Sequence, residues 1–379
     1  MIRKLALAAL PAIALFAAPA DARDIWTKPQ AQKWYDAQPW LVGANYTPRT
    51  AINQLEMWQA ESWDPKTIDQ ELGWAQAIGM NTMRVYLHNL LWENDPEGLK
   101  KRMDEFLTIA SKHGIRPVFV LFDSCWDPNP VVGQQHPPIP GVHNSGWVQA
   151  PGAARLADKT QYDKLENYVK DIVGTFANDK RVLAWDVWNE PNNEGGGNYT
   201  PTPNKKALVA GLLTQVFDWA QSVDPVQPLT SGVWIGEHWD KPETLDAVEK
   251  VQLSRSDVNS FHDYNWPESF KRRANQMLSY GRPVICTEYM ARGNGSTFDG
   301  DLPIAKKMNI GMINWGLVDG KTQTRLPWDS WKKPYTYDEP TVWFHEVFHA
   351  DGTPYRKAET DLIRAMSAAP KGVVPAAEY

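Results

Sequence analysis

The chain has 379 residues, 42% of them apolar and 22% charged, with a formal net charge of −6 and two Cys. This length and composition can bury a large core, which excludes a disordered protein and a small disulfide scaffold. The mild acidity argues against a nucleic-acid or polybasic membrane partner. The 19 Trp residues exceed what a core needs. Because a buried indole N–H requires a partner, this surplus indicates a surface that stacks on flat ligands.

Residues 1–22 have the pattern of a secretory signal peptide. Arg3 and Lys4 precede an apolar run over 5–18, and the small residues around Ala20 and Ala22 offer cleavage sites. A membrane anchor is the weaker interpretation, because the run falls short of the roughly 20 residues that span a bilayer. We expect an exported protein, periplasmic or extracellular, that is soluble after cleavage.

From residue 23 onward, short β-rich runs alternate with longer helical patterns. This alternation predicts a single (β/α)8 TIM barrel over 23–379, an α/β fold, with a loose tail from about residue 367. An open doubly wound sheet is the alternative, but that fold has a Gly-rich turn after its first strand, where this chain has Asn45-Tyr46-Thr47-Pro48. Strands, several of them continuous apolar runs typical of parallel sheets, are predicted over 40–45, 82–87, 117–122, 182–187, 228–234, 258–262, 283–288 and 311–317.

Helix signals fill the intervals between these strands. Asp64-Pro65 combines an N-cap with a proline at the first helical position, and Gly79 ends that helix. Gly114 ends the next helix, and later ones are predicted over 158–178, 204–222, 244–251, 267–280, 302–308 and 357–366. This order places Cys125, after the third strand, and Cys286, in the seventh, on opposite walls. Bridged Cα atoms lie within about 7 Å, so we predict two free thiols.

The strand ends carry the candidate chemistry, because barrel active sites lie at the C-terminal ends of the strands. The fourth predicted strand runs into Asn189-Glu190-Pro191, and the seventh ends at Glu288. A carboxyl after an apolar run tends to have a raised pKa, whereas a partner held by hydrogen bonds stays ionised. Two such carboxylates beside an aromatic floor are the groups that glycosidic bond cleavage requires. The other strand ends supply Arg84, His262, Tyr264 and Trp315.

Taken together, these residues resemble clan A glycoside hydrolases, above all glycoside hydrolase family 5, in the right strand order over the whole of residues 23–379. The resemblance implies a retaining double displacement on β-linked plant-type polysaccharide by an endo-β-1,4-glycanase such as a cellulase, mannanase or xylanase. It implies that Glu190 is the acid/base, that Glu288 is the nucleophile and that Asn189 holds the sugar 2-hydroxyl.

The resemblance also implies supporting roles around the nucleophile. Arg84 and Tyr264 would hydrogen-bond Glu288, with His262 nearby, and Trp315 would stack on the sugar. Many family members place a His just after the third strand, where this chain has Phe122-Asp123-Ser124-Cys125-Trp126. The sugar specificity therefore stays open.

The Trp residues divide into two sets. Several lie at or beyond predicted strand ends, where indoles can stack on sugar rings around an extended cleft: Trp92, Trp126, Trp188, Trp234, Trp239, Trp266, Trp315, Trp328 and Trp331. Among these we expect substrate contacts from Trp126, Trp188, Trp266, Trp315 and Trp328. The helix or core set is Trp26, Trp34, Trp74 and Trp219. The long connections over 127–157 and 319–340 are expected to decide the sugar specificity and the choice between internal and terminal cleavage, by walling or opening the cleft. The sequence does not predict their path.

Three alternatives remain open. An exo-acting β-mannosidase-like or β-glucosidase-like enzyme on oligosaccharides is the first, and a carbohydrate-binding protein without catalysis is a remote second. The third is a zinc metalloprotease, because His345-Glu346-Val347-Phe348-His349 matches the H-E-x-x-H signature. Asp351-Gly352 follows at once and would end a helix, so we interpret that match as chance. We expect a carbohydrate as the partner, no cofactor or metal, and a monomer.

Overall fold

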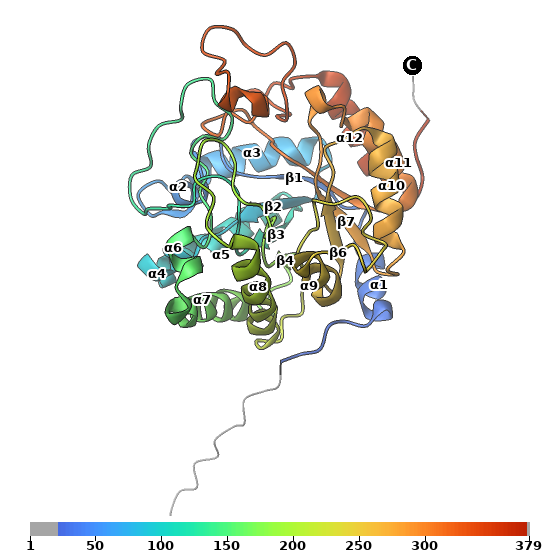
Figure 1. Cartoon of the computed structure of the whole chain (residues 1–379). Coiled ribbons are helices and arrows are strands. Elements are labelled where there is room, and N and C mark those ends of the chain that lie inside the picture. The colour runs from blue at the N-terminus through green and yellow to red at the C-terminus, as the bar shows by residue number, and fades with distance from the viewer. Residues whose placement is uncertain (1–21, 377–379) are drawn as a thin grey trace, which may run out of the picture.

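The computed structural model describes residues 22–376, so the predicted signal peptide, apart from its last residue, lies outside the described residues. All eight strands are parallel and form one sheet in the order β5-β4-β3-β2-β1-β8-β7-β6, surrounded by helices (Figure 1). The strands are β1 (Val42–Asn45), β2 (Thr82–Tyr86), β3 (Arg116–Val120), β4 (Ala184–Asp186), β5 (Leu229–Thr230), β6 (Asn259–His262), β7 (Val284–Glu288) and β8 (Gly311–Asn314).

The α-helices connect these strands along the outside of the barrel. They are α1 (Lys28–Asp36), α2 (Gln54–Trp58), α3 (Pro65–Ala77), α4 (Asn89–Asn94), α5 (Pro96–Lys112), α6 (Ala153–Ala157), α7 (Tyr162–Thr175), α8 (Lys205–Gln221), α9 (Ala247–Arg255), α10 (Pro267–Leu278), α11 (Phe298–Met308) and α12 (Lys357–Ala368). Short 3-10 turns lie at η1 (Lys159–Gln161), η2 (Arg292–Asn294) and η3 (Trp328–Trp331).

The seam between β5 and β6 closes the barrel without a regular ladder. Three backbone hydrogen bonds cross it, from Asp257 N to Leu229 O at 2.8 Å, from Val233 N to Ser260 O at 3.1 Å and from His262 N to Val233 O at 2.9 Å. The predicted (β/α)8 barrel is therefore confirmed, with one join looser than the others.

The barrel has a sealed end and an open end. Helix α1, which sequence reasoning missed, buries Ala31 and Tyr35 in a cluster with Leu41, just before β1, and with Val118 of β3 and Ile285 of β7. A larger core between the strands and the outer helices includes Trp219 and packs Trp74 along its edge, while Trp26 and Trp34 pack against the α1 cluster. The helix or core set of Trp residues is thus confirmed, and the opposite end of the strands is free for a site.

Two predicted helix starts are wrong because a cap lies elsewhere. Helix α9 begins at Ala247 instead of residue 244, since Asp246 accepts from Glu249 N and Glu249 accepts from Asp246 N in a capping box. Helix α11 begins at Phe298, four residues before the prediction, because Thr297 accepts from Gly300 N. Beyond α12, Lys371 donates to the backbone oxygen of Tyr35 at 2.8 Å.

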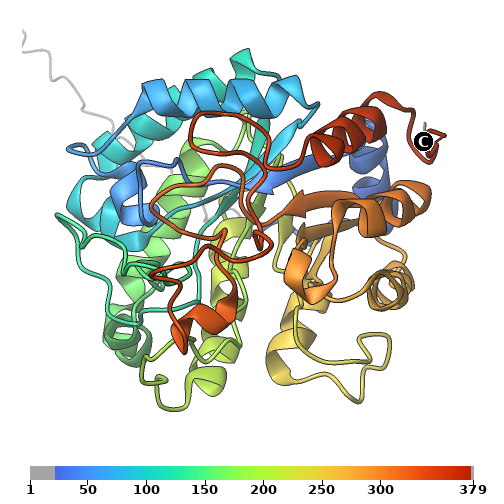
Figure 2. The same cartoon turned by 90° about the horizontal axis from the view of Figure 1, so that it is seen from above.

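The loops after β3 and β8 lie together above the open end. Backbone N–H groups of the first loop donate to the second, from Asn144 to Thr322 O at 2.8 Å and from His143 to Ser330 Oγ at 2.9 Å. In Figure 2 the orange-red segment after β8 passes over the barrel. These two loops therefore form one continuous wall beside the strand ends, a path that the sequence left open.

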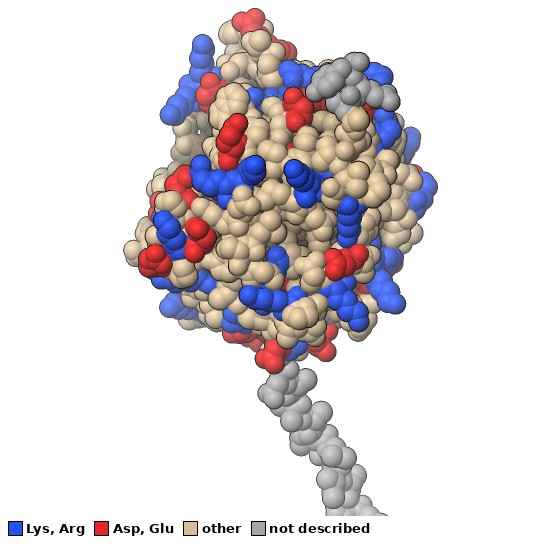
Figure 3. Space-filling view, turned by 90° about the vertical axis from the view of Figure 1, so that its right-hand side faces the viewer, with Lys and Arg blue, Asp and Glu red and all other residues tan. Residues whose placement is uncertain are grey.

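The outer surface carries both signs of charge. Figure 3 shows Lys and Arg interspersed with Asp and Glu among neutral residues on the side of the molecule that lies to the right in Figure 1. Within residues 22–376, no helix combines the length and apolarity needed to cross a membrane. The two Cys residues are both free, as predicted.

Candidate active site

The two candidate glutamates meet at the open end of the barrel. Glu288 is the last residue of β7, and Glu190 lies four residues beyond β4. One oxygen of each carboxyl and one ring nitrogen of His262 all lie within 4.8 Å of one another. Glu190 has a φ of +42°, a left-handed conformation that is uncommon for a residue with a Cβ. Strain of this kind persists where the surrounding structure fixes a functional side chain.

Glu288 is surrounded by hydrogen-bond donors. Arg84 Nη1 and the Tyr86 hydroxyl donate to its Oε1 at 2.8 and 2.9 Å. The Tyr264 hydroxyl donates to Oε2 at 2.8 Å. The contacts of Arg84 and Tyr264 are those that the family resemblance implied, and together the three donors stabilise a negative charge on this carboxyl.

Arg84 is the hub of this network, and it is completely buried. Its Nε and Nη2 both donate to Asp186 Oδ2, at 3.0 and 2.8 Å. Nη2 also donates to Asn189 Oδ1 at 2.7 Å, and Nη1 donates to Asn45 Oδ1 at 2.8 Å. The guanidinium therefore bridges the ends of β1, β4 and β7 and fixes the orientation of Asn189 as well as Glu288.

Glu190 has donors on both oxygens. His262 Nδ1 lies 2.9 Å from Oε1, and because an ionised carboxylate only accepts, Nδ1 carries the proton. Asn193 Nδ2 and Cys125 Sγ donate to Oε2 at 2.7 and 3.3 Å. Burial raises the pKa of Glu190, but the hydrogen bond and charge of His262, with Asn193 and Cys125, outweigh it, so the net direction is downward. The raised pKa expected from the apolar run is therefore wrong for the unliganded protein.

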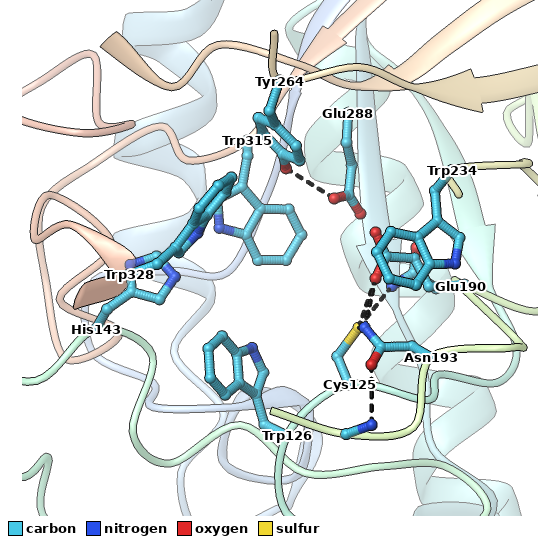
Figure 4. Close-up of a pocket in the computed structure, with 12 residues that line it drawn as sticks. Cys125, Trp126, His143, Glu190, Asn193, Trp234, Tyr264, Glu288, Trp315 and Trp328 are labelled. Carbon is cyan, nitrogen blue, oxygen red and sulfur yellow. Dashed lines mark hydrogen bonds between the residues drawn. The ribbon is translucent and has the colours of Figure 1, made fainter. Parts of the chain in front are cut away.

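A cavity of about 330 Å³ opens at this carboxyl pair (Figure 4). It is lined by Cys125, Trp126, His143, Asn189, Glu190, Asn193, Gly195, Trp234, Tyr264, Glu288, Trp315 and Trp328. A second cavity of about 310 Å³ shares Glu190, Trp234, Tyr264 and Trp328 with the first and continues past His262 toward Arg273. The two cavities form one cleft with Glu190 at their junction.

The cleft contains part of the predicted Trp set. Trp126, Trp315 and Trp328 line it, together with Trp234. Trp315 packs edge-on against Tyr86 and Trp147, each at a centroid distance of 6.0 Å, which fixes its ring as a floor. Trp331 stacks on Trp126 at 5.1 Å from behind.

Two of the Trp residues predicted to contact substrate do not line the cleft. Trp188 is 1% exposed, because its indole N–H donates to Ser124 Oγ and its ring packs on Phe122 at 5.2 Å. Trp266 is 66% exposed but lies over Gly295, at the start of α10, outside the lining of the cleft. Two members of the rim set, Trp92 and Trp239, also pack into the core.

Sequence reasoning missed several residues of the site. Tyr86 lies two positions after Arg84 on β2, so strand alternation places both on one face. Asp186 is an acid inside an apolar run, which signals a buried cation partner. Cys125, Asn193 and His143 carried no such signal, because their positions depend on loop conformations.

The histidine-rich motif does not form a zinc site of the H-E-x-x-H type. Residues 345–349 are not helical, His345 Nδ1 lies 2.6 Å from Met290 O, and the His349 ring packs against Trp343 at 4.4 Å. Among the described residues, the group with metal-ligand spacing is Glu190, His262 and Glu288. Both Glu288 oxygens already accept hydrogen bonds, one of them from the cationic Arg84 at 2.8 Å. These three residues therefore fit the hydrogen-bond network of the protein better than they fit coordination of a cation.

Sequence relatives are mannan-degrading enzymes of fungi. The chain is 24% identical over 213 residues to mannan endo-1,4-beta-mannosidase A of Podospora anserina, which covers 51% of this chain and 51% of the relative. It is 24% identical over 199 residues to the enzyme of the same name from Hypocrea jecorina, covering 46% of this chain and 43% of the relative. The chain thus spans about half the length of the curated relatives that it matches.

Solved structures share the fold. A GH5_18 variant from Streptomyces cattleya in complex with Manβ1-4GlcNAc superimposes with a TM-score of 0.60 and 13% identity, over 88% of this chain and 82% of that chain. An endo-β-1,4-mannanase from Thermotoga petrophila gives a TM-score of 0.55 and 14% identity, over 88% and 77%. A family model described as cellulase (glycosyl hydrolase family 5) matches residues 45–321. Because this match covers more than half of the chain, the protein belongs to glycosyl hydrolase family 5.

Proposed function

We propose that this protein is a retaining glycoside hydrolase that cleaves β-1,4-mannan internally. The observation that carries the proposal is the pair of buried glutamates whose oxygens approach within 4.8 Å at the junction of a continuous cleft. Retaining enzymes hold their carboxyls about 5–5.5 Å apart, whereas inverting enzymes need about 6.5–9.5 Å to admit a water. The observed spacing supports the retaining mechanism.

The reaction proceeds in two displacements. In the first, the Glu288 carboxylate attacks the anomeric carbon while the glycosidic C–O bond breaks, and Glu190 gives its proton to the departing oxygen. In the second, Glu190 takes a proton from water, which attacks the same carbon and releases Glu288. Arg84, Tyr86 and Tyr264 hold both oxygens of Glu288 in position for the attack.

The assignment of substrate rests on two supports. The curated relatives named above are mannan endo-1,4-beta-mannosidases. The cleft extends to both sides of Glu190, which suits a chain that is cut internally. Trp315 and Trp126 offer apolar faces on which sugar rings can stack. Export of the protein stays a prediction from the pattern of residues 1–22.

The first test is product analysis on mannan, cellulose and xylan, with the products sized over time. Internal cleavage of mannan produces a ladder of oligosaccharides from the earliest time point, whereas release of single sugars alone would favour the exo-acting alternative. Proton NMR of the first product reads the anomeric configuration, and an inverted product would contradict the double displacement.

The second test separates the two glutamates. Glu288→Ala is expected to abolish turnover while oligosaccharide binding persists, and unchanged hydrolysis would refute the assignment. Glu190→Ala is expected to lose about 10²–10⁴-fold on natural substrates but less on aryl glycosides, because a good leaving group needs little protonation. Glu166→Ala, on the outer helix α7, is the control for removing a carboxyl far from the cleft.

A further inference from the structure

Two side chains hold the Glu190 oxygen that His262 leaves free. Asn193 Nδ2 donates to Oε2 at 2.7 Å, and Cys125 Sγ donates to the same atom at 3.3 Å. Both residues line the 330 Å³ cavity, and Figure 4 shows them converging on the carboxyl from one side. His262, on Oε1, lines the second cavity instead. The Glu190 carboxyl therefore accepts hydrogen bonds from residues that line both cavities of the cleft.

The orientation of Asn193 is fixed by its own turn. Its backbone N–H donates to Glu190 O at 2.8 Å, and its Oδ1 accepts from Gly195 N at 2.9 Å. With the oxygen of the carboxamide occupied in this way, the NH₂ group faces Glu190. Asn193 is thus a donor to the Glu190 carboxyl. Exchange of its amide oxygen and nitrogen would lose both this bond and the bond from Gly195 N.

The orientation of Cys125 is also fixed locally. Its backbone N–H donates to Asp123 Oδ1 at 3.1 Å, and the next residue, Trp126, has a left-handed φ of +66°. Burial raises the pKa of the Cys125 thiol well above its ordinary value, with the nearby Asp123 and Glu190 charges acting in the same direction. The side chain therefore keeps its S–H proton and acts as a weak donor.

We propose that Cys125 and Asn193 are positioning residues for the acid/base, which hold Glu190 Oε2 on the cavity side while His262 holds Oε1. The inference rests on the proposed role of Glu190. Each donor favours the ionised carboxyl over the protonated one, so together they set how readily Glu190 takes up and releases its proton. They also prevent rotation of the carboxyl away from the glycosidic oxygen.

Other titratable groups also face Glu190, and they are the same in the wild type and in the variants. Lys205 Nζ is held by Ser124 O at 2.8 Å and Gln149 Oε1 at 2.9 Å, and burial lowers its pKa to about 8. The titratable groups around Glu190, from the ends of β3, β6 and β7 and from α8, are Asp123, Cys125, His262, Tyr264, Glu288 and Lys205. Substitution of Cys125 or Asn193 by a neutral residue leaves the other charges in place.

The decisive experiment is a titration of Glu190 in the full protein by carbon-13 NMR of labelled Glu side chains, with Glu190→Gln to assign the signal. Loss of one neutral donor is expected to raise the pKa of Glu190 by about 0.5–1 unit in Cys125→Ala and in Asn193→Ala. Cys125→Ser retains a donor and is expected to stay at or below the wild-type value. Ser124→Ala is the matched control, because Ser124 bonds Pro191 and Trp188 in the same loop and does not bond Glu190.

The pH dependence of kcat/KM gives a second measurement, which would not change if Cys125 and Asn193 had a purely structural role. The basic limb of kcat/KM on unactivated mannooligosaccharides is expected to shift to higher pH in both Ala variants, by the same amount as the titration. Titration curves of both Ala variants that coincide with wild type, or an equal shift in Ser124→Ala, would overturn the inference. Wild-type protein that cleaves no glycoside would instead refute the proposed function, and the NMR titration would still decide whether the two side chains set the pKa of Glu190.

Discussion

Replacing Arg84 is expected to cost more stability than replacing any surface arginine. The five N–H groups of the guanidinium make six hydrogen-bond contacts, with one N–H shared between two acceptors, to groups at the ends of four strands. Two of the acceptors are the carboxylates of Asp186 and Glu288. The Arg84 and Asp186 side chains are 0% exposed, and Glu288 is 6% exposed. Arg84→Met preserves the length of the side chain but leaves two buried negative charges without their cation. Breaking a buried pair in this way costs about 3–5 kcal/mol.

A double-mutant cycle tests this reasoning. Asp186→Asn in the Arg84→Met background removes one of the stranded charges, so the double variant is expected to recover about 1–3 kcal/mol relative to the sum of the single variants. The free energy of unfolding is measured by urea denaturation followed by Trp fluorescence. Arg181→Met is the control, because its pairs with Asp104 and Asp179 lie near the surface and are worth about 1 kcal/mol or less. Strictly additive losses at Arg84 and Asp186, or equal losses at Arg84 and Arg181, would refute the argument.

Three further predictions address the site and its surroundings. Tyr264→Phe removes the 2.8 Å bond to Glu288 Oε2 and is expected to lower kcat/KM about 10-fold or more, whereas an unchanged kcat/KM would show that the bond is dispensable. Trp315→Ala is expected to raise KM for mannooligosaccharides about 10-fold, and an unchanged KM would remove Trp315 from the binding surface. Burial raises the pKa of Glu346 from 4.5 to about 8, so the folded protein retains a proton that the unfolded chain releases, and stability is full below pH 4.5 and declines as the pH rises to 8. The Tm of wild type is therefore expected to fall more steeply over this window than that of Glu346→Gln, and parallel Tm curves would contradict the buried, protonated state.

The sequence predicted the parts of the site that lie on strands. Glu288 ends an apolar run, and Arg84 on β2 and Tyr264, two residues beyond β6, follow from the positions that the resemblance aligned. Strand alternation is strictly periodic, so a residue's face can be inferred from its neighbours. The same rule, applied more fully, would have added Tyr86 beside Arg84.

The parts that lie on loops could not be predicted in the same way. Cys125 and Asn193 reach Glu190 from loops in which Trp126 and Glu190 adopt left-handed backbone conformations. A local pattern signals such conformations for Gly, but for residues with a Cβ they depend on tertiary contacts. The buried position of Trp188 could not be predicted for a related reason, since a residue just past a strand can turn into the neighbouring loop, as its bond to Ser124 shows.

The irregular seam between β5 and β6 has consequences for local opening of the barrel and for the substitutions that it tolerates. Amide hydrogens along an interrupted ladder exchange with solvent through small local openings and do not require global unfolding. A Cβ at Gly232 would meet Ser260 Oγ and Thr287 Oγ1 at 3.2 Å and His262 Nε2 at 3.4 Å. Even alanine would therefore crowd the two hydroxyls and contact the imidazole that bonds Glu190. The seam with the fewest regular hydrogen bonds thus contains a glycine whose replacement by a larger residue would crowd its neighbours.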